Sequence, residues 1–269
     1  LTDMAFKIIV CAKQVPDTNV IKTDPKTGTL IRDGVPSILN PDDANALEEA
    51  LKIKDKHPDT HITVVSMGPP QATDLLMECV AMGADEGVLL SDRAVGGSDT
   101  QATSNALVAT IKKIGDYDMI FAGRQAIDGD TAQVGPQIAE KLNLPQITYV
   151  EEFEIADNLK DITVKRQLED GYEIIKVQTP CMLTCIKELN TPRYMSMNGI
   201  FDAKNKPIKV WSAKDVEVDL STVGLEASPT NVFRSFTPAP KGKGVVLEGD
   251  TEKDVAKQLL ANLKSKHVI

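Results

Sequence analysis

Short apolar runs alternate with longer amphipathic segments from the start of the chain to about Pro145. The runs are rich in β-branched residues, whereas the longer segments repeat their apolar residues at helical spacing. This alternation is typical of successive β–α units, which build a parallel sheet covered by helices. The expected strands are residues 8–11, 62–66, 88–90 and 119–122.

The helix between the first two strands has a well-marked beginning. Asn40 can cap it, Pro41 suits its first turn, and Asp42 and Asp43 would lie at the positive end of its dipole. Three further helices are expected from about Pro70 to Gly83, from about Asp99, and from about Asp130 to Leu142.

The alternation of strand-like and helix-like segments ends after Pro145. Strand candidates follow one another there without an intervening helix, at residues 147–155, 162–168, 173–177 and 182–186. Such a succession predicts antiparallel additions to the sheet. An earlier excursion over residues 17–36 contains the turn sequence Asp24–Gly28 and predicts a hairpin over the sheet edge. The predicted fold class is therefore α/β, with a mostly parallel sheet of βα units and antiparallel additions.

The core is expected to end near Lys187, so that residues 1–187 form the first domain. Residues 188–249 are rich in turn residues and prolines, and an amphipathic helix is expected again only near residues 251–265. A tail of this length and composition usually wraps a partner protein, and a mobile extension is the alternative. Residues 188–269 are therefore predicted to form a C-terminal arm.

Composition excludes several classes of function. The formal net charge of −9, with lysines scattered among carboxylates, argues against nucleic-acid binding. No apolar run reaches the roughly 20 residues of a membrane-spanning helix, and no export leader is recognisable, so a cytoplasmic protein is expected. No metal site is expected, because the few histidines lie apart from the cysteines. Buried thiols, not disulfides, are predicted for Cys11, Cys79, Cys181 and Cys185.

The segment from Gly123 to Gly135 is the strongest candidate for a binding site. It follows an apolar strand and precedes a helix, so the free amides of the helix start could point at a phosphate group. Gly129 would allow close backbone approach, and Thr131 and Gln133 could donate hydrogen bonds to a phosphate or a ribose. The spacing matches neither a Walker loop nor the three-glycine dinucleotide motif. A capped structural helix therefore remains the alternative.

Other strand ends and helix starts should converge on the same edge of the sheet. They are residues 11–13, residues 67–69 and the helix start at residues 40–42. Small or backbone-exposing residues at all three favour a nucleotide as the ligand. Lys13 could neutralise a phosphate or a reduced flavin. No paired nucleophile and base is recognisable, so the sequence indicates binding, with any reaction carried by a cofactor.

Several of these segments match a known family. They are residues 10–17 (VCAKQVPD), 40–43 (NPDD), 123–128 (GRQAID) with their continuation, and 164–175 (VKRQLEDGYEII) followed by 180–184 (PCMLT). Together they resemble the β subunit of electron-transfer flavoproteins, over nearly the whole chain. The resemblance implies an adenine-nucleotide-binding α/β core and a partner α subunit that carries FAD and is contacted by the C-terminal arm.

The resemblance also implies a second nucleotide on this chain, either FAD or AMP. Residues 128–136, 29–36 and 228–230 are similar to the electron-bifurcating members of the family. In those members the chain holds FAD and takes hydride from NADH, so that NAD(H) is a substrate. A single electron then passes to ferredoxin or flavodoxin, and the other reaches an FAD-dependent dehydrogenase through the α subunit. The alternatives are a non-bifurcating β subunit with structural AMP and, more distantly, a nucleotide-binding stress-type protein that acts alone.

By the same resemblance, particular residues are expected to contact the cofactor or a partner. For the dehydrogenase, which could act on an acyl-CoA, an enoyl-CoA or a hydroxy acid, the expected contacts are Tyr194, Met195 and Met197. Met197 stands where the family often has Leu, and Asn198 departs from a frequent Pro. Without the resemblance, residues 190–199 would be read as an ordinary surface loop. The expected cofactor contacts are Cys11, Ala12, Lys13, Asn40, Pro41, Asp42, Met67, Gly68, Gly123, Arg124, Gln125, Asp128, Gly129, Asp130, Thr131, Ala132, Gln133 and Val134.

Overall fold

The computed structural model of the protein describes residues 5–17, 22–23, 30–31, 36–230 and 242–269. The chain divides into two compact units, Leu1–Phe233 and Arg234–Ile269. Among the described helices, none is both long enough and apolar enough to cross a lipid bilayer.

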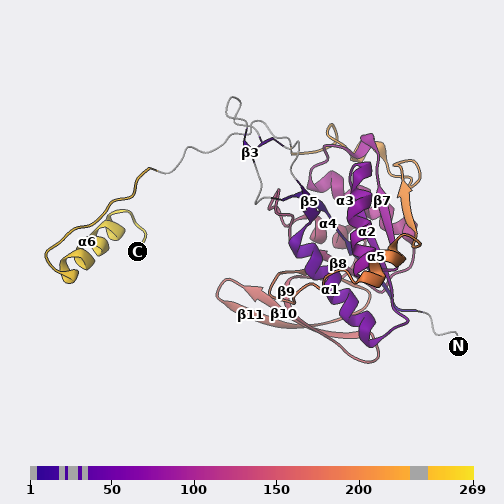
Figure 1. The fold of residues 1–269 in the computed structure, drawn as a ribbon, viewed down its shortest axis with the longest axis horizontal. Coiled ribbons are helices and arrows are strands. Elements are labelled where there is room, and N and C mark those ends of the chain that lie inside the picture. The colour runs from indigo at the N-terminus through magenta and orange to yellow at the C-terminus, as the bar shows by residue number, and fades with distance from the viewer. Residues whose placement is uncertain (1–4, 18–21, 24–29, 32–35, 231–241) are drawn as a thin grey trace. The chain divides into compact units, whose positions relative to one another are not determined.

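The larger unit is built on a nine-stranded sheet, whose strand order is β11-β10-β9-β12-β8-β1-β6-β7-β13. Figure 1 shows β9, β10 and β11 lying next to one another. In the part of the sheet that runs in the order β9-β12-β8-β1-β6-β7-β13, every pair of neighbouring strands is parallel. β10 runs antiparallel to both of its neighbours, β9 and β11. This arrangement confirms the predicted fold class. The strands are Lys7–Cys11 (β1), His61–Met67 (β6), Glu86–Leu90 (β7), Met119–Gly123 (β8), Gln146–Ile155 (β9), Asp161–Leu168 (β10), Gly171–Gln178 (β11), Cys181–Cys185 (β12) and Ile208–Trp211 (β13).

Helices cover both faces of this sheet. Successive side chains of a strand point to opposite faces, so Val10 packs in one apolar cluster and its neighbour Ile9 in the other. The cluster around Val10 includes Leu47 of α1 and Leu76 of α2, and the cluster around Ile9 includes Ile111 of α3. The helices are Pro41–Lys56 (α1), Thr73–Met82 (α2), Thr100–Ile114 (α3), Val134–Lys141 (α4) and Met197–Ala203 (α5), with single 3₁₀ turns at Pro70–Ala72, Arg93–Val95 and Leu220–Thr222.

Two short strand pairs lie outside the main sheet. β2 (Gln14–Pro16) pairs antiparallel with β5 (Ser37–Leu39), and β3 (Lys22–Thr23) pairs antiparallel with β4 (Leu30–Ile31). The hairpin expected over residues 17–36 falls mostly outside the described residues, and β3 with β4 is the part of it that the structure contains.

The prediction that residues 182–186 form an antiparallel strand is wrong. β12 lies between β8 and β9 and is parallel to both. The chain reverses direction twice, from β9 to β10 and from β10 to β11, and therefore enters β12 in the direction of β9. Of the strands after Pro145, β10 is the one that runs against the rest of the sheet.

The sheet also continues past Lys187, where the sequence predicts that the core ends. β13 pairs in parallel with β7, and the compact unit extends to Phe233. The four residues of β13 and the seven of α5 are too few to produce a recognisable apolar period, so sequence periodicity cannot detect them.

The smaller unit contains one helix, α6 (Glu252–Ser265), at the place predicted from the sequence. Its start is capped by Thr251, whose side chain accepts a hydrogen bond from the backbone N–H of Asp254. No residue of α6 is buried, and Leu259 and Leu260 are exposed. The apolar side of this helix is therefore not covered by the described residues of its own unit, 242–269.

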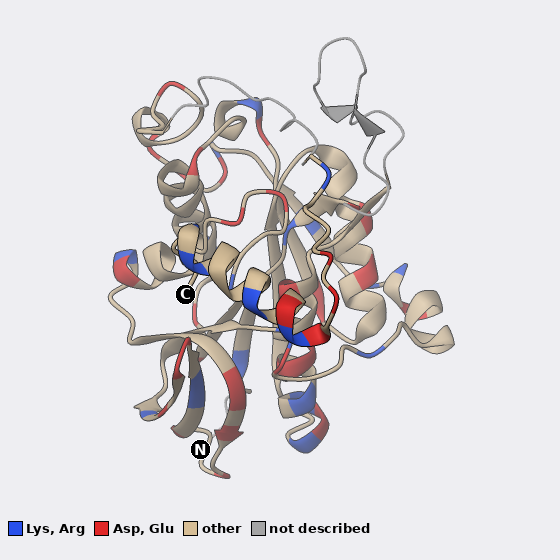
Figure 2. Ribbon diagram, turned by 90° about the vertical axis from the view of Figure 1, so that its left-hand side faces the viewer, with Lys and Arg blue, Asp and Glu red and all other residues tan. Residues whose placement is uncertain are grey.

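Charged residues of both signs are interspersed along the described helices and strands, as Figure 2 shows. The four cysteines are free thiols and are buried, as predicted. Burial raises the pKa of both Cys11 and Cys181 to about 12, with a further contribution from the Asp43 carboxylate at Cys11. These thiols therefore stay protonated at neutral pH.

Candidate functional site

The carboxyl ends of β1, β6 and β8 lie side by side at one edge of the sheet, because β1 pairs in parallel with both other strands. The first residue after β1, Ala12, continues this pairing, since its backbone N–H donates to the Val65 carbonyl at 2.9 Å. The loops that begin at Cys11, Met67 and Gly123 consequently meet at this edge, as the sequence predicts.

Asp43, in the first turn of α1, joins two of these loops. Its Oδ2 accepts a hydrogen bond from the backbone N–H of Lys13 at 2.8 Å, and its Oδ1 accepts one from the backbone N–H of Gly123 at 2.9 Å. Burial raises the pKa of this carboxyl to about 7, although the two backbone donors and Asn40 act in the opposite direction. Sequence reasoning assigned Asp43 to the helix dipole and missed this role.

Gly123 packs closely against the start of α1. A Cβ atom at this position would lie 2.7 Å from the backbone C of Asp42 and the backbone N of Asp43, and would collide with the Asp43 carboxylate. The start of α1 can therefore approach the end of β8 only because residue 123 has no side chain.

Asn40 does not cap α1 with its side chain, which corrects the expectation from the sequence. Its Nδ2 instead donates to the carbonyl of Gln125 at 2.8 Å, and its Oδ1 accepts from the backbone N–H of Ile127 at 3.0 Å. The amide thus uses both its donor and its acceptor to hold the loop after β8, because those two loop groups present complementary partners. Asn40 is buried in this position.

The loop between β8 and α4 is held at its base and open at its tip. Lys13 Nζ forms an ion pair with Asp128 at 2.7 Å, and Gln125 Nε2 donates to Asp130 at 2.9 Å. Residues 128–131 are exposed, and a Cβ atom at Gly129 would meet nothing within 4 Å. The backbone at Gly129 is therefore open to solvent.

The helix after this loop begins at Val134 and not near Asp130 as predicted. Asp130 and Ala132 have φ angles of 50° and 53°, which are incompatible with a right-handed helix. Gln133, just before the helix, accepts a hydrogen bond at its Oε1 from the Thr100 hydroxyl at 2.7 Å. The loop thereby also contacts the beginning of α3.

Arg124 is occupied by structural contacts. Its Nε lies 3.4 Å from Asp42 Oδ2, and its guanidinium lies 5.6 Å from the ring centroid of Tyr149. Neither of the two paired atoms has a hydrogen-bond partner among the described residues, and Ser66 Oγ, buried near the end of β6, is in the same state. Burial raises the pKa of Asp42, and the charge of Arg124 opposes that shift.

A comparison with known protein families identifies the fold. The sequence model of the electron transfer flavoprotein domain matches residues 27–216. The chain belongs to the electron transfer flavoprotein family.

Three curated relatives of this flavoprotein subunit each match 98% of the chain over 100% of their own length. Over 264 residues it is 61% identical to the caffeyl-CoA reductase-Etf complex subunit CarD of Acetobacterium woodii. It is 57% identical to the electron transfer flavoprotein subunit beta of Clostridium acetobutylicum and 51% identical to the acryloyl-CoA reductase electron transfer subunit gamma of Anaerotignum propionicum. These relatives confirm the resemblance to the β subunit.

The residues at the sheet edge fit a nucleotide in several respects. Cys11 and Ala12 are buried, so only their backbone can face a ligand, whereas Lys13 is exposed. Asp42 Oδ2, Arg124 Nε and Ser66 Oγ have no hydrogen-bond partner among the described residues, so hydrogen-bonding capacity is left near the edge. The structure thus brings together the expected contacts from β1, α1, β6 and the loop after β8.

The expected partner contacts of the flavoprotein lie away from these loops, on the segment that leads into α5. Tyr194 is 96% exposed and Met197 70% exposed, and Met195 is also exposed. Two further apolar side chains of α5, Ile200 and Phe201, are exposed next to them. Residues 194–201 are called the apolar segment below.

Proposed function

We propose that this chain is the β subunit of a heterodimeric electron transfer flavoprotein that binds FAD at the edge formed by β1, β6 and β8. In this proposal it accepts hydride from NADH for electron bifurcation in the cytoplasm. Ferredoxin or flavodoxin receives one electron, and an FAD-dependent dehydrogenase receives the other through the α subunit. The observation that carries the proposal is the open loop between β8 and α4, whose backbone at Gly129 faces solvent beside the converging strand ends.

Particular groups of the chain would hold the cofactor. The exposed loop of residues 128–133 offers backbone amides, and the Thr131 and Gln133 side chains add hydrogen bonds to a diphosphate. Lys13, half-exposed and paired with Asp128, lies where a negative charge of the ligand could be neutralised. The bound flavin supplies the exchange between two-electron and one-electron transfer, while the chain binds and orients it.

The names of the relatives bear on the partner. CarD is named as a subunit of a caffeyl-CoA reductase complex, and the Anaerotignum propionicum relative as an electron transfer subunit of an acryloyl-CoA reductase. Both names contain a reductase of a CoA thioester. We therefore assign this chain a dehydrogenase partner that acts on an acyl-CoA or enoyl-CoA in preference to one that acts on a hydroxy acid.

Nucleotide content separates this function from its alternative. The chain is co-expressed with its α subunit, the heterodimer is denatured, and the released nucleotides are quantified by chromatography. Two FAD per heterodimer, together with bleaching of the flavin by NADH under anaerobic conditions, are expected. One FAD and one AMP, with no bleaching by NADH, would instead assign the chain to the non-bifurcating β subunits.

A further inference from the structure

Asp43 is a buried carboxylate whose two oxygens hold two different loops of the proposed nucleotide site. Its Oδ2 accepts a hydrogen bond from the backbone N–H of Lys13, which follows β1, and its Oδ1 accepts one from the backbone N–H of Gly123, the last residue of β8. Only 7% of Asp43 is exposed, so water has little access to these bonds. The carboxylate is thus a bridge between the two loops.

Lys13 extends this attachment to the loop between β8 and α4. Its side-chain Nζ pairs with Asp128 at 2.7 Å, and its carbonyl accepts a hydrogen bond from the backbone N–H of Asn40 at 3.0 Å. Asp128 lies next to Gly129, at the open tip of that loop. A displacement of the Lys13 backbone therefore also displaces the ion pair beside the tip.

The other two parts of this junction are fixed by the core. Leu47 of α1 is 1% exposed and packs in the main apolar cluster, so the helix that carries Asp43 is held in place. Gly123 is held by its pairing with Cys185 of β12. A change at the carboxylate is therefore taken up by the loop that contains Lys13.

Protonation of Asp43 removes one of its two acceptors. An ionised carboxylate accepts hydrogen bonds at both oxygens, whereas a protonated carboxyl group carries an O–H donor at one of them. Each oxygen faces a backbone N–H, which is itself a donor, so the protonated oxygen has no suitable partner there. Because Gly123 is fixed in β8, the hydrogen bond that is lost is the one from Lys13.

Several titratable groups surround Asp43, and most of them keep their charge near neutral pH. Burial raises the pKa of Asp43 to about 7, and the carboxylate of the neighbouring Asp42 adds to this shift. Burial also raises the pKa of Asp42, although the charge of Arg124 acts in the opposite direction. The other titratable neighbours are three buried thiols, whose pKa values burial raises: Cys11 of β1, Cys79 of α2 and Cys185 of β12. These thiols stay neutral, so the charge near pH 7 changes mainly at Asp43.

We propose that Asp43 is a positioning residue of the nucleotide site, whose ionised form holds Lys13 and the loop after β8 in the arrangement that binds the diphosphate of an adenine dinucleotide. The inference rests on the proposed function for the place of the nucleotide. Binding selects the ionised carboxylate and releases a proton from the protonated one. The like charge of the phosphates acts against this selection, but residues 128–131 are exposed, and solvent screens charges that lie there.

The test uses the heterodimer of this chain with its α subunit, depleted of the nucleotide that this chain binds. FAD is the probe, because its diphosphate is esterified on both sides and does not change charge between pH 5.5 and pH 8.5. Quenching of flavin fluorescence gives the dissociation constant at each pH. In the wild-type protein this constant should fall about tenfold from pH 5.5 to pH 8.5, and about half a proton should be released per FAD near pH 6.5.

Asp43→Asn distinguishes positioning from a merely structural role. The asparagine amide, like the protonated carboxyl group, offers one acceptor and one donor, and it does not titrate. This variant should therefore bind FAD at every pH as wild type does at pH 5.5. A structural role alone would instead weaken binding by the same factor at every pH, and that result would overturn the inference.

Asp118→Asn is the matched control. Asp118 Oδ2 accepts a hydrogen bond from the backbone N–H of Lys7 at 2.8 Å, so this carboxylate joins the start of β1 to the start of β8. It has the same kind of partner as Asp43 on the same two strands, at the opposite edge of the sheet. The control should bind FAD with the affinity and the pH dependence of wild type.

Other results also decide the question. Binding that weakens as pH rises would show that repulsion between Asp43 and the phosphates dominates, which contradicts the inference. If Asp43→Asn does not assemble with the α subunit, calorimetry of the wild-type protein in two buffers of different ionisation enthalpy counts the protons, and no release near pH 6.5 would refute it. AMP in place of FAD would refute the proposed function alone. Titration with AMP would then still compare wild type with Asp43→Asn, because the ionisation of the AMP phosphate cancels in the ratio of their dissociation constants.

Discussion

Asp43 places an ionisable group at the junction between the two central strand-end loops. The carboxylate oxygens each accept a backbone N–H, one from Lys13 and one from Gly123. The residue is buried, so the negative charge is held in a medium of low polarity and is compensated mainly by those two dipoles. A change of protonation at this one residue therefore alters both loops.

This arrangement predicts a pH dependence of stability. The pKa of Asp43 is raised from 3.8 to about 7 in the folded chain, so the folded state binds the extra proton between these values. The free energy of unfolding should therefore fall as pH rises from about 4 to about 7. Asp43→Asn, which cannot titrate, should remove this component. Urea unfolding of both proteins at pH 5 and pH 7.5 measures it.

The control for this experiment is Asp55→Asn. Hydrogen bonding to Arg193 lowers the pKa of Asp55, so its stabilising contribution is present above its ordinary pKa and is lost as pH falls below it. Asp55→Asn should consequently leave the slope between pH 5 and pH 7.5 unchanged. An equal slope in wild type and Asp43→Asn would refute the assignment of the effect to Asp43.

At the scale of single elements, the loop after β8 contains two glycines with opposite requirements. Gly123 lies against the backbone of Asp42 and Asp43, whereas Gly129 faces open space. The first serves the packing of α1 on β8, and the second serves a ligand in the proposed function. Substitution by alanine should separate the two roles.

Gly123→Ala should destabilise the chain by about 1–3 kcal/mol, because the new methyl group forces the start of α1 away from β8. Gly129→Ala should change the free energy of unfolding of the nucleotide-free chain by less than about 0.5 kcal/mol. It should nevertheless lower the amount of nucleotide retained by the heterodimer. Chemical denaturation and nucleotide quantification provide the two measurements. Full retention in Gly129→Ala would contradict the placement of the ligand above this loop.

Elements with long, regular apolar patterns could be predicted from the sequence, and short or locally determined ones could not. α3 begins after Asp99, and α2 ends at Gly83, as expected from capping residues. The sequence prediction placed the beginning of α4 too early, because the positive φ angles of Asp130 and Ala132 cannot be recognised from the residue types. The direction of β12 depends on how many times the chain reverses before it. The pairing of the strands determines that number, and the local sequence does not show it.

The same limit applies to the candidate site. Convergence of the loops at Cys11, Met67 and Gly123 follows from parallel topology, so it could be predicted. The hydrogen bonds of Asn40 and Asp43 to those loops join residues more than 25 positions apart, and only the folded chain brings them together. The sequence indicated that Asn40 and Asp43 mattered and misassigned what they contact.

At the scale of the whole molecule, the unit Leu1–Phe233 has a buried apolar core, whereas the described residues of the unit Arg234–Ile269 form one helix without buried residues. α6 has no buried residue, and an isolated helix of its length is marginally stable in water. In the proposed function, this arm contacts the α subunit. Its apolar side would then be covered in the heterodimer.

Amide hydrogen exchange tests this expectation on the full chain. Backbone amides of Glu252–Ser265 should exchange within seconds in the isolated chain and should be protected at least tenfold longer in the heterodimer. Amides of β1 and β8 at the centre of the sheet should be protected in both samples. Equal exchange of α6 in the two samples would show that the arm does not contact the α subunit.

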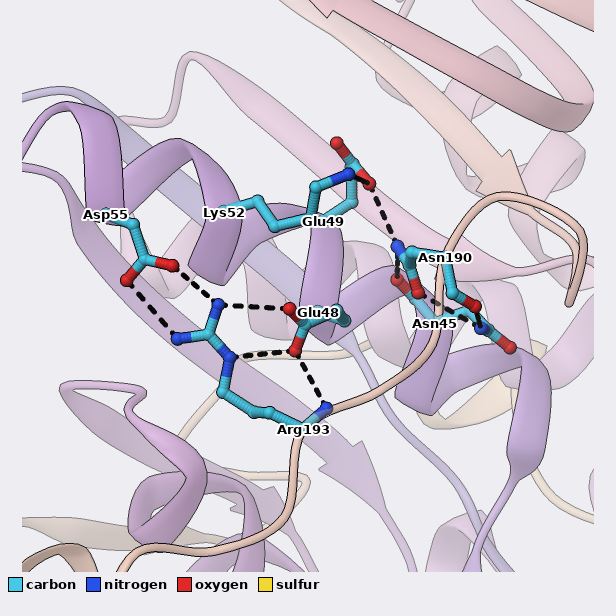
Figure 3. A network of polar contacts seen from close by, with 7 residues as sticks. All are labelled: Asn45, Glu48, Glu49, Lys52, Asp55, Asn190 and Arg193. Carbon is cyan, nitrogen blue, oxygen red and sulfur yellow. Dashed lines mark hydrogen bonds and ion pairs between the residues drawn. The ribbon is translucent and has the colours of Figure 1, made fainter.

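Asn190 and Arg193 hydrogen-bond to Glu49 and Glu48 of α1 (Figure 3), and the predicted partner contacts follow them directly in the chain. Tyr194 and Met197 contribute almost nothing to the core, so their replacement carries little penalty for folding. Asn40, which precedes α1, and Asp43 and Glu48 within it are by contrast buried, so substitutions there should cost more stability. In the proposed function, partner choice would rest on the replaceable side chains of the apolar segment, and a new reductase could be acquired by substitutions among residues 194–201 while the cofactor site stays unchanged.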